Sequence, residues 1–420
     1  MKAMACGVVL LSGGLKLELR RDFGLEAISA LKEIISEGRH ASSVIGDALA
    51  RNPRWSDRQR ALFSNMLYDM IRYWRLLWSG LGREPSFDDR DLWHVLGAYQ
   101  IMKGEKVQNR PEYRGLSPDR VKKRLERGRM NRAVRESVPE WLDLLGEAEL
   151  GEDWDSILHS LNTYSEIAVR VNTLRTNKEE LRKRLRSSGY DVFPVEWAPD
   201  ALVFKKKFNV FRSREFQEGL FEVQDPASQA VAPFLEVRPG MRVADACAGQ
   251  GGKTLHLCCL MRNTGSILAM DDVEWKLQEL RKRARRAGAQ NIETRVVSGT
   301  KSYKRLKGTM DRVLLDVPCS GLGALRRNPD IKWSLDEGAL ERLKVLQRQI
   351  LASYGPLLKP GGRMVYATCS VLPSEGEEQV CWFLGENGSK FELVSEKRLR
   401  PDTDGFDGFY MALLERVQRA

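Results

Sequence analysis

The stretch MRVADACAGQGGKT, residues 241–254, decides the fold class of this chain. An apolar run typical of a strand leads into a loop with three glycines, and an apolar helical run follows from Thr254. A bare glycine backbone between a strand and a helix can approach a ligand closely, while the helix N-terminal amides face anionic groups. The stretch therefore predicts a nucleotide-type binding loop in an α/β sheet.

The chain after this loop alternates between β-rich and helical segments. Such alternation indicates βαβ units, with a parallel sheet covered by helices on both faces. The β-rich runs after the loop are SILAMD (266–271), TRVVS (294–298), DRVLLD (311–316) and RMVYAT (363–368). Two final runs, FELVSE (391–396) and GFYMALLERV (408–417), are expected to close the sheet as an antiparallel hairpin.

The chain before the loop has two other patterns. Apolar residues recur at helical spacing from about residue 22 to 104, and a basic segment follows, which predicts an all-α domain over 22–138. Residues 139–236 mix a helix-like piece, LRTNKEELRKRLRSSG (174–189), with the short β-rich runs DALVF (200–204) and GLFEVQD (219–225), and predict a small α+β unit. The α/β domain then spans 237–420.

The composition is that of a folded protein with a basic surface. The 420 residues are 42% hydrophobic and 30% charged, which excludes a mainly disordered chain and fits two or three domains. Lys and Arg number 68 against 57 Asp and Glu, a net charge of +11 that favours RNA, DNA or anionic lipid as a partner. Residues 103–135 alone hold 12 basic and 4 acidic residues, although a solvated basic surface has the same composition.

The cysteines and the N-terminus argue for a reduced, cytoplasmic protein. Seven cysteines spread over a long chain do not resemble a secreted disulfide framework, and no Cys or His spacing fits a zinc site, so we expect no metal. Residues 3–15 resemble the apolar part of a signal peptide, but no small-residue cleavage site follows. No run is long enough to span a bilayer, and no heptad pattern appears, so we expect no membrane association and a monomer.

The glycine loop fits some nucleotide ligands better than others. A P-loop needs glycine at position 247, where Cys247 stands, and a dinucleotide fingerprint needs glycine at Thr254. A smaller ligand, S-adenosylmethionine, fits the short loop. Asp271 ends the next strand, where a carboxylate could hold the ribose hydroxyls, although a helix cap fits its position equally well.

Two cysteines lie just beyond predicted strands. Asp316 and Cys319 follow one β-rich run in LLDVPCSG, and Cys369 follows the next in YATCS. Function in open α/β sheets collects at these carboxyl ends, and neighbouring strands would turn both thiols toward one pocket. We interpret Cys258, Cys259 and Cys381 as structural.

A methyl donor beside two thiols suggests one reaction. Carbon 5 of a pyrimidine becomes nucleophilic only after a thiolate adds at carbon 6, and a second thiol can assist release of the methylated base. A carboxyl group at ring nitrogen 3 would offset charge, and Asp316 is placed for that role. The residues alone do not rank the two cysteines.

The motifs resemble those of a known family. In their order and spacing they are similar to the Sun/Nop family of RNA cytosine-5 methyltransferases, most closely its bacterial branch that modifies small-subunit ribosomal RNA. The motifs are QDPASQ (224–229), DACAGQGGKT (245–254), DRVLLDVPCSGLGALRRNPDIKW (311–333), YATCSVLPSEGEEQ (366–379) and DGFY (407–410).

The resemblance implies a Rossmann-like methyltransferase domain, a small RNA-binding unit before it and a NusB-like helical domain in front. It further implies that Cys369 attacks carbon 6, that Cys319 assists product release, and that Asp316 lies between donor and cytosine. Lys253 would reach into the active site and Asp271 would hold the ribose. The implied donor loop consists of Cys247, Ala248, Gly249, Gln250, Gly251, Gly252 and Lys253.

The chain departs from the family pattern at two positions. Gln250 stands where the family has proline, which should change the stiffness of the loop more than its contacts. Thr300 stands where an acidic residue normally lies near the adenine amino group, so a charge-assisted hydrogen bond is replaced by a neutral one.

The leading hypothesis is therefore an S-adenosylmethionine-dependent RNA cytosine-5 methyltransferase with a ribosomal RNA partner and no DNA partner. Arg326, Arg327 and Lys332 are candidate RNA contacts, each of which could instead be a solvated charge. A tRNA substrate, a non-catalytic RNA-binding assembly factor and a P-loop ATPase are the alternatives.

Overall fold

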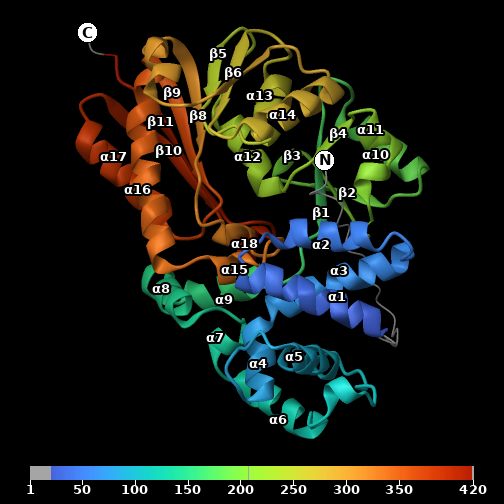
Figure 1. Ribbon diagram of the computed structural model, residues 1–420. Helices are drawn as coiled ribbons and strands as arrows, with labels where there is room; N and C mark the ends of the chain where they lie inside the picture. Colours follow the sequence, from blue (N-terminus) through green and yellow to red (C-terminus); the bar gives the residue numbers. More distant parts are fainter. Residues whose placement is uncertain (1–19, 207, 419–420) are drawn as a thin grey trace. The chain divides into compact units, whose positions relative to one another are not determined.

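A computed structural model describes residues 20–206 and 208–418, except for the side chain of Thr300. The signal-peptide-like run at 3–15 lies outside these residues. The chain forms two compact units (Figure 1). The first contains the chain up to Tyr164, a short piece ending at Asn209, and Leu325–Asp336, whereas the second contains Ser165–Lys206, Val210–Ala324 and the chain from Glu337.

The first unit is built of helices. Its core gathers aromatic side chains such as Phe23, Trp55 and Phe63, and a capping box between Ser56 and Gln59 starts one of its longest helices. The predicted likeness to NusB stays a prediction. The α-helices are α1 (Arg21–Leu31), α2 (Ala41–Arg51), α3 (Asp57–Arg72), α4 (Trp74–Leu81), α5 (Asp89–Met102), α6 (Pro118–Gly128), α7 (Arg132–Arg135), α8 (Glu140–Leu150), α9 (Asp153–Leu161) and α15 (Ile331–Ser334), with a π-helix at Lys32–Ser36 after α1.

The basic segment at 103–135 includes the amphipathic helix α6. Val121 and Leu125 are buried, while Lys122, Lys123 and Arg127 are exposed. The helix therefore contributes to the core of the first unit and presents a basic face to solvent.

A small antiparallel sheet opens the second unit. Its order is β2-β3-β1-β4, and every observed pair is antiparallel. The strands are β1 (Ile167–Val171), β2 (Val192–Val195), β3 (Ala198–Phe204) and β4 (Phe221–Val223), and the helices are α10 (Lys178–Ser187) and α11 (Arg214–Gln217). The sequence pattern identified β3, β4 and α10 but not β1 or β2.

A seven-stranded mixed sheet forms the larger part of the second unit. Its order is β10-β11-β9-β8-β5-β6-β7, with parallel pairs from β7 to β9 and antiparallel pairs on either side of β11. This confirms the predicted parallel sheet and its closing hairpin. The strands are β5 (Arg242–Asp245), β6 (Ser266–Asp271), β7 (Ile292–Val296), β8 (Met310–Asp316), β9 (Leu358–Thr368), β10 (Phe391–Leu399) and β11 (Phe409–Arg416).

Helices cover both faces of this sheet, as Figure 1 shows. One core packs α12 (Pro226–Phe234) and α13 (Gly252–Leu260) on the sheet, and α14 (Glu274–Ala287) packs beside α13. The opposite core packs α16 (Glu337–Tyr354) and α17 (Glu377–Asn387). The short helix α18 (Pro401–Asp404) connects β10 and β11. Among the described residues, no helix has both the length and the apolarity to cross a membrane.

Two glycines that precede strands of the large sheet differ in how closely other backbone atoms approach them. Gly265 and Gly308 both adopt positive φ, but a Cβ atom at Gly265 would lie 2.2 Å from the Met241 carbonyl oxygen, whereas one at Gly308 would meet nothing within 4 Å. Both alanine variants lose the permissive backbone of glycine, and only Gly265→Ala also overpacks. We expect Gly265→Ala to lower the unfolding free energy by about 1–3 kcal/mol more than Gly308→Ala, measured by urea denaturation. Equal losses would contradict the close approach.

Candidate active site

The glycine loop between β5 and α13 folds onto the end of β6. The amide of Ala248 donates to the Met270 carbonyl oxygen at 2.9 Å, and that of Gly249 donates to Asp271 Oδ2 at 2.9 Å. No atom lies within 4 Å of the place where a Cβ of Gly249 would stand. The loop thus leaves open space beside its backbone and a carboxylate at its edge.

Two arginine side chains donate hydrogen bonds to backbone carbonyl oxygens of the loop. Arg283 on α14 donates to the Gln250 carbonyl oxygen at 2.9 Å and pairs with the buried carboxylate of Glu222 at 2.9 Å. Arg170 on β1 is almost fully buried and donates to the Gly252 carbonyl oxygen at 2.6 Å. The position of the loop therefore depends on side chains from the small sheet and from α14.

Asp245 ends β5 beneath the loop and is fully buried. Its Oδ2 atom accepts a hydrogen bond from Thr254 Oγ1 at 2.7 Å. Burial raises the pKa of this carboxyl group to about 7, because the charged form loses its hydration. Cys247, two residues later, also has a raised pKa through burial and remains a neutral thiol at neutral pH.

Asp316 and Lys253 meet at the carboxyl ends of the strands. Lys253 Nζ lies 2.6 Å from Asp316 Oδ2 and 4.9 Å from the centroid of the Phe409 ring. The ammonium group is thus fixed by a charge-assisted hydrogen bond and by an aromatic face. The pair offers one carboxylate and one cation to a molecule that enters from the loop side.

The two predicted cysteines lie side by side. Strands β8 and β9 pair in parallel, with Asp316 opposite Ala367, and this brings the Sγ atoms of Cys319 and Cys369 to 3.4 Å. The hydrogen bond with Cys369, followed by burial, raises the pKa of Cys319 well above its ordinary value. Cys319 therefore keeps its proton at neutral pH, and its thiol lies within hydrogen-bond distance of the Cys369 sulfur.

A buried carboxylate joins the segments that carry the cysteines, and the sequence reasoning did not assign it. Glu375 is fully buried, and its Oε1 atom accepts from the Ser320 amide at 2.8 Å and from Gln347 Nε2 at 3.0 Å. Ser320 Oγ also donates to Glu375 and lies 3.3 Å from Ser370 Oγ. Glu375 lies in the motif YATCSVLPSEGEEQ, but only its burial shows that it links the segments that carry the two cysteines.

Backbone contacts also fix the segment around Cys369. The Gly323 amide donates to the Cys369 carbonyl oxygen at 2.9 Å, and the Gly408 amide donates to the Gly323 carbonyl oxygen at 2.9 Å. A Cβ atom at Gly323 would lie 2.1 Å from the Gly408 carbonyl oxygen. This close packing explains two motif glycines that the sequence analysis left without a role.

The three predicted RNA contacts lie in the first unit and have different environments. Arg327 is exposed, and Arg326 is partly buried and donates to the Tyr164 carbonyl oxygen at 2.9 Å. Lys332 is completely buried, and its Nζ donates to Asn162 Oδ1 at 2.6 Å and to the Glu136 carbonyl oxygen at 2.8 Å. The prediction of an RNA contact at Lys332 does not fit this position, because its ammonium group has no surface to offer.

The remaining predicted site residue is Thr300, and its side chain lies outside the described residues. Among the side chains that are described, no group of three or more His, Cys, Asp and Glu residues could hold a metal ion. The prediction that the chain uses no metal stays a prediction.

Comparison with known proteins identifies the family. A family model described as "16S rRNA methyltransferase RsmB/F" matches residues 232–415, and one for the ferredoxin-like domain of RsmF/B-like methyltransferases matches residues 138–211. The chain is 31% identical to ribosomal RNA small subunit methyltransferase B of Vibrio cholerae over 428 residues, which cover 93% of this chain and 96% of that protein. The chain belongs to the RsmB/F family of 16S rRNA methyltransferases.

Other relatives agree with this assignment. A probable ribosomal RNA small subunit methyltransferase B of Synechocystis is 32% identical over 70% of either chain. The crystal structure of PH0851 superimposes with a TM-score of 0.80 at 26% identity and covers 96% of this chain and all of that one. A methyltransferase homologue from Pyrococcus horikoshii gives a TM-score of 0.61 at 28% identity, over 68% of this chain and 98% of its own.

Family membership confirms the predicted resemblance and the cofactor. The chain is an S-adenosylmethionine-dependent RNA methyltransferase of the RsmB/F type. The open backbone at Gly249 and the carboxylate of Asp271 fit such a donor, because the first leaves room for it and the second can accept from hydroxyl groups.

The raised pKa of Asp245 predicts a pH dependence of stability. Between about pH 4 and pH 7 the folded state holds a proton that the unfolded state has lost, so unfolding free energy falls as the pH rises. The slope from this group is about 1.4 kcal/mol per pH unit. We expect Asp245→Asn to remove it, as measured by urea denaturation at pH 5, 6 and 7.

The control for this prediction is Asp311→Asn. Burial opposes ionisation of Asp311, but the hydrogen bond from Lys359 and nearby positive charges lower its pKa, so it titrates below this pH range. The Asp311 variant should therefore keep the slope of the wild type. An unchanged slope in Asp245→Asn would show that Asp245 is already ionised at pH 5.

Proposed function

We propose that this methyltransferase modifies carbon 5 of a cytosine in small-subunit ribosomal RNA through a covalent adduct with Cys369. The observation that carries the proposal is the 3.4 Å separation of the Cys319 and Cys369 sulfurs, at the ends of paired strands. A single thiol has many structural uses, but two thiols that share a proton at the ligand edge of a sheet suit nucleophilic catalysis.

The first step is attack by Cys369 on carbon 6 of the cytosine. In this step the protonated thiol of Cys319, 3.4 Å from the Cys369 sulfur, would donate a hydrogen bond to the attacking sulfur. As the sulfur bonds to carbon 6, electron density moves to carbon 5 and ring nitrogen 3. Asp316 is proposed to lie beside nitrogen 3 and orient the ring, and the ammonium group of Lys253, which pairs with it, would offset the negative charge that develops there.

The second step is methyl transfer and release. Carbon 5 of the adduct would take the methyl group of S-adenosylmethionine as the donor's sulfur–methyl bond breaks and S-adenosylhomocysteine leaves. Water would then take the carbon 5 proton, and the electrons of that bond restore the ring double bond as the carbon–sulfur bond to Cys369 breaks. The departing sulfur becomes a thiolate again, and the Cys319 thiol stabilises it by the same hydrogen bond, which gives Cys319 its role in release.

The residues around the glycine loop are proposed to bind the donor. Asp271 would accept from the ribose hydroxyls, and the backbone from Cys247 to Lys253 would line the rest of the site. Thr300 near the adenine remains part of this proposal. The amide of Val273 also donates to Asp271, at 2.9 Å, so the carboxylate is already oriented before a ligand binds.

The RNA is proposed to contact several parts of the chain. The unit at 139–236 would bind RNA, the domain at 237–420 would carry the catalytic site, and the domain at 22–138 would be NusB-like. The exposed basic side chains of α6 and Arg327 are suited to phosphate contacts. The protein would act as a cytoplasmic monomer without a DNA partner. A tRNA substrate is the alternative that the fold of the site equally permits.

The cysteine roles can be separated by methyl transfer from labelled S-adenosylmethionine to RNA that lacks the modification. We expect Cys369→Ser to lose activity by at least about a thousandfold, since the nucleophile is gone. Cys319→Ser should form the adduct but release it slowly, and it should therefore accumulate as a protein–RNA complex on a denaturing gel.

The control is Cys381→Ser, which changes an exposed thiol on α17. It should label RNA at the wild-type rate. Full activity of Cys369→Ser would point to a non-catalytic thiol pair and revive the assembly-factor alternative. Label at a position other than cytosine carbon 5 would also overturn the proposal.

A second prediction concerns Gln250, where the family has proline. We expect the hydrogen bond from Arg283 to the Gln250 carbonyl to supply part of the rigidity that proline would give. Arg283→Met should weaken S-adenosylhomocysteine binding about tenfold, or about 1.4 kcal/mol by calorimetry. Adding Gln250→Pro should restore most of that affinity.

The control for this pair is Arg281→Met, on the exposed side of the same helix. Glu222 stays paired with Arg286 when Arg283 is replaced, so no isolated buried charge results. If Gln250→Pro changes the affinity of wild type and of Arg283→Met by the same factor, the two positions are not coupled and the explanation is wrong.

A further inference from the structure

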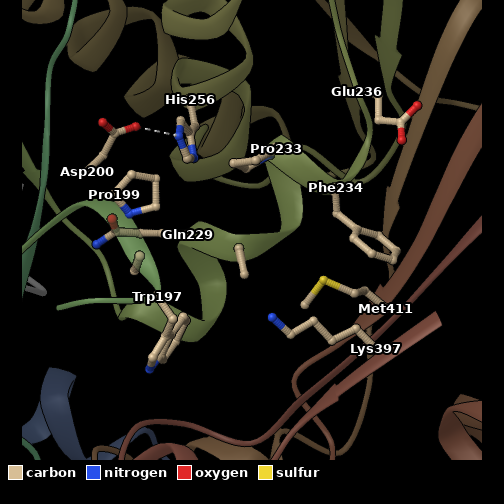
Figure 2. Close-up of a pocket in the computed structure, with 12 residues that line it drawn as sticks. Trp197, Pro199, Asp200, Gln229, Pro233, Phe234, Glu236, His256, Lys397 and Met411 are labelled. Atoms are coloured by element: carbon tan, nitrogen blue, oxygen red, sulfur yellow. Dashed lines mark hydrogen bonds and ion pairs between the residues drawn. The ribbon is translucent and has the colours of Figure 1, made fainter. Parts of the chain in front are cut away.

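Two hollows in the second unit differ in the charge of their linings. Figure 2 shows the first, about 320 Å³ in volume, whose lining carries two carboxylates beside one lysine. The second is an open groove of about 720 Å³, walled by the chain after β1, the turn between α11 and β4, and the C-terminal end of α14. Its ionisable lining residues are Arg175, Glu218, Arg285 and Arg286. We call it the arginine groove, and of the two hollows it is the one that suits an anionic partner.

The walls of the arginine groove are held against each other by backbone contacts. The buried side chain of Asn172 donates through Nδ2 to the Gly219 carbonyl oxygen at 2.7 Å and to the Ala287 carbonyl oxygen at 2.8 Å. These carbonyl groups belong to the α11–β4 turn and to the last residue of α14. A Cβ atom at Gly219 would lie 2.1 Å from the Arg286 carbonyl oxygen. The groove therefore keeps its shape without a ligand, which lowers the entropy lost when one binds.

The acidic groups at the groove already have cationic partners. Glu218, the acidic lining residue, pairs with Arg184 and with Arg214, the latter at 2.7 Å. Behind the lining, the buried carboxylate of Glu222 pairs with Arg286. Neither glutamate is then left to neutralise a further arginine, so the charge that the groove offers a partner is positive.

Two arginines of the groove are available to such a partner. Arg175 and Arg285 are exposed, and among the described residues neither side chain forms an ion pair or a hydrogen bond. The Arg175 guanidinium lies beside the end of α14, where a Cβ atom at Gly288 would be 3.2 Å from its Nη2 atom. Each guanidinium offers five N–H donors in a planar fork that matches two oxygens of one phosphate. Many surface arginines are only solvated, but these two line the same fixed groove.

Helix α14 connects the groove with the donor loop. It starts at Glu274, just after Asp271, and its 14 residues span about 21 Å at about 1.5 Å each. Trp275 and Arg286 are eleven residues apart on this helix, close to three full turns, so they share one face. Trp275 is 58% exposed and offers a flat ring on which a base can stack. RNA at the catalytic edge can therefore continue along α14 to the groove.

We propose that the arginine groove binds the sugar–phosphate backbone of the RNA substrate, outside the segment that holds the target base. The inference rests on the RNA substrate of the function proposed above. A recess between two walls suits a strand better than a bilayer, whose surface is flat. Phosphate contacts carry no sequence information, but they fix the position and orientation of the bound nucleic acid. The groove would thus hold the RNA at a second point, roughly 20 Å along α14 from the donor loop.

The first test counts phosphate contacts by the salt dependence of binding. A labelled transcript of small-subunit ribosomal RNA is bound to the full chain on filters, from about 50 to 200 mM KCl. Each lost phosphate contact lowers the slope of log K against log salt by about 0.7–0.9. The double variant Arg175→Gln/Arg285→Gln should therefore lower the slope by about 1.4–1.8 and weaken binding at least about tenfold at low salt. An unchanged slope in the folded variant would overturn the proposal.

The matched control removes the same charge elsewhere in the second unit. Lys307 and Lys390 are exposed, and among the described residues neither side chain has an ion pair. Lys307 follows Leu306, which packs in the core with α16 on the other face of the sheet, and Lys390 precedes the edge strand β10. Lys307→Gln/Lys390→Gln should keep the slope of the wild type. An equal fall in both double variants would show a general effect of net charge and overturn the groove. Thermal unfolding of each variant checks its fold.

Trp275→Ala separates stacking from charge on the proposed path. An aromatic contact releases no counterions, so this variant should bind the same transcript roughly fivefold or more weakly with the slope of the wild type. A lower slope in Trp275→Ala would mean that the slope does not count phosphate contacts, and the assignment of the two arginines would then fall.

Two further measurements separate the groove from its alternatives. Wild-type binding to phosphatidylglycerol vesicles that is lost in Arg175→Gln/Arg285→Gln, with an unchanged RNA slope, would assign the groove to a lipid surface and overturn the RNA proposal. Methyl transfer to the same transcript is measured in parallel. Methylated cytosine with an unchanged slope would remove the groove and leave the proposed reaction intact. A lowered slope without cytosine methylation would keep the groove and overturn the reaction.

Discussion

The parallel pairing of β8 with β9 is the constraint on which the site depends. These strands are 50 residues apart at their cysteines, yet the ladder continues past Asp316, where the Val317 amide donates to the Ala367 carbonyl oxygen at 3.0 Å. Both thiols then leave the sheet at the same edge. Beyond the end of the ladder, the hydrogen bonds of Glu375 and the backbone contacts at Gly323 hold together the segments that follow β8 and β9.

Buried charges do much of this positioning, and each has a partner. Glu222 is held by Arg283 and Arg286. Glu375 accepts from the neutral donors Ser320 and Gln347, so its negative charge is spread over several hydrogen bonds. A buried carboxylate of this kind is stabilised by its network and costs several kcal/mol when the network is broken. The arrangement therefore has little freedom to adjust. Rigid support of this sort suits a reaction in which a sulfur, a ring carbon and a methyl group must line up.

The sequence predicted the features that produce a local pattern of residues. Alternating β-rich and helical runs gave the parallel sheet, and the positions of Cys319 and Cys369 after two runs indicated that their thiols would meet. The strands β1 and β2 were missed because they have only five and four residues, too few to show an alternating pattern. Lys332 was wrongly predicted to contact RNA and Glu375 was given no role, both for another reason. Charged residues are normally exposed, and only tertiary packing shows that these two are completely buried.

The path of the chain between β8 and α16 limits how the helical unit can be separated from the rest of the protein. After Ala324 the chain enters the first unit, where Trp333 donates to the Ile71 carbonyl oxygen at 2.8 Å and Lys332 is fully buried, and it returns at Glu337. A gene that lost the region before Tyr164 would still encode this excursion. Its tryptophan would face water, and its lysine would lose the three oxygen acceptors that now surround it. In this chain the helical unit could therefore be removed cleanly only together with residues 325–336.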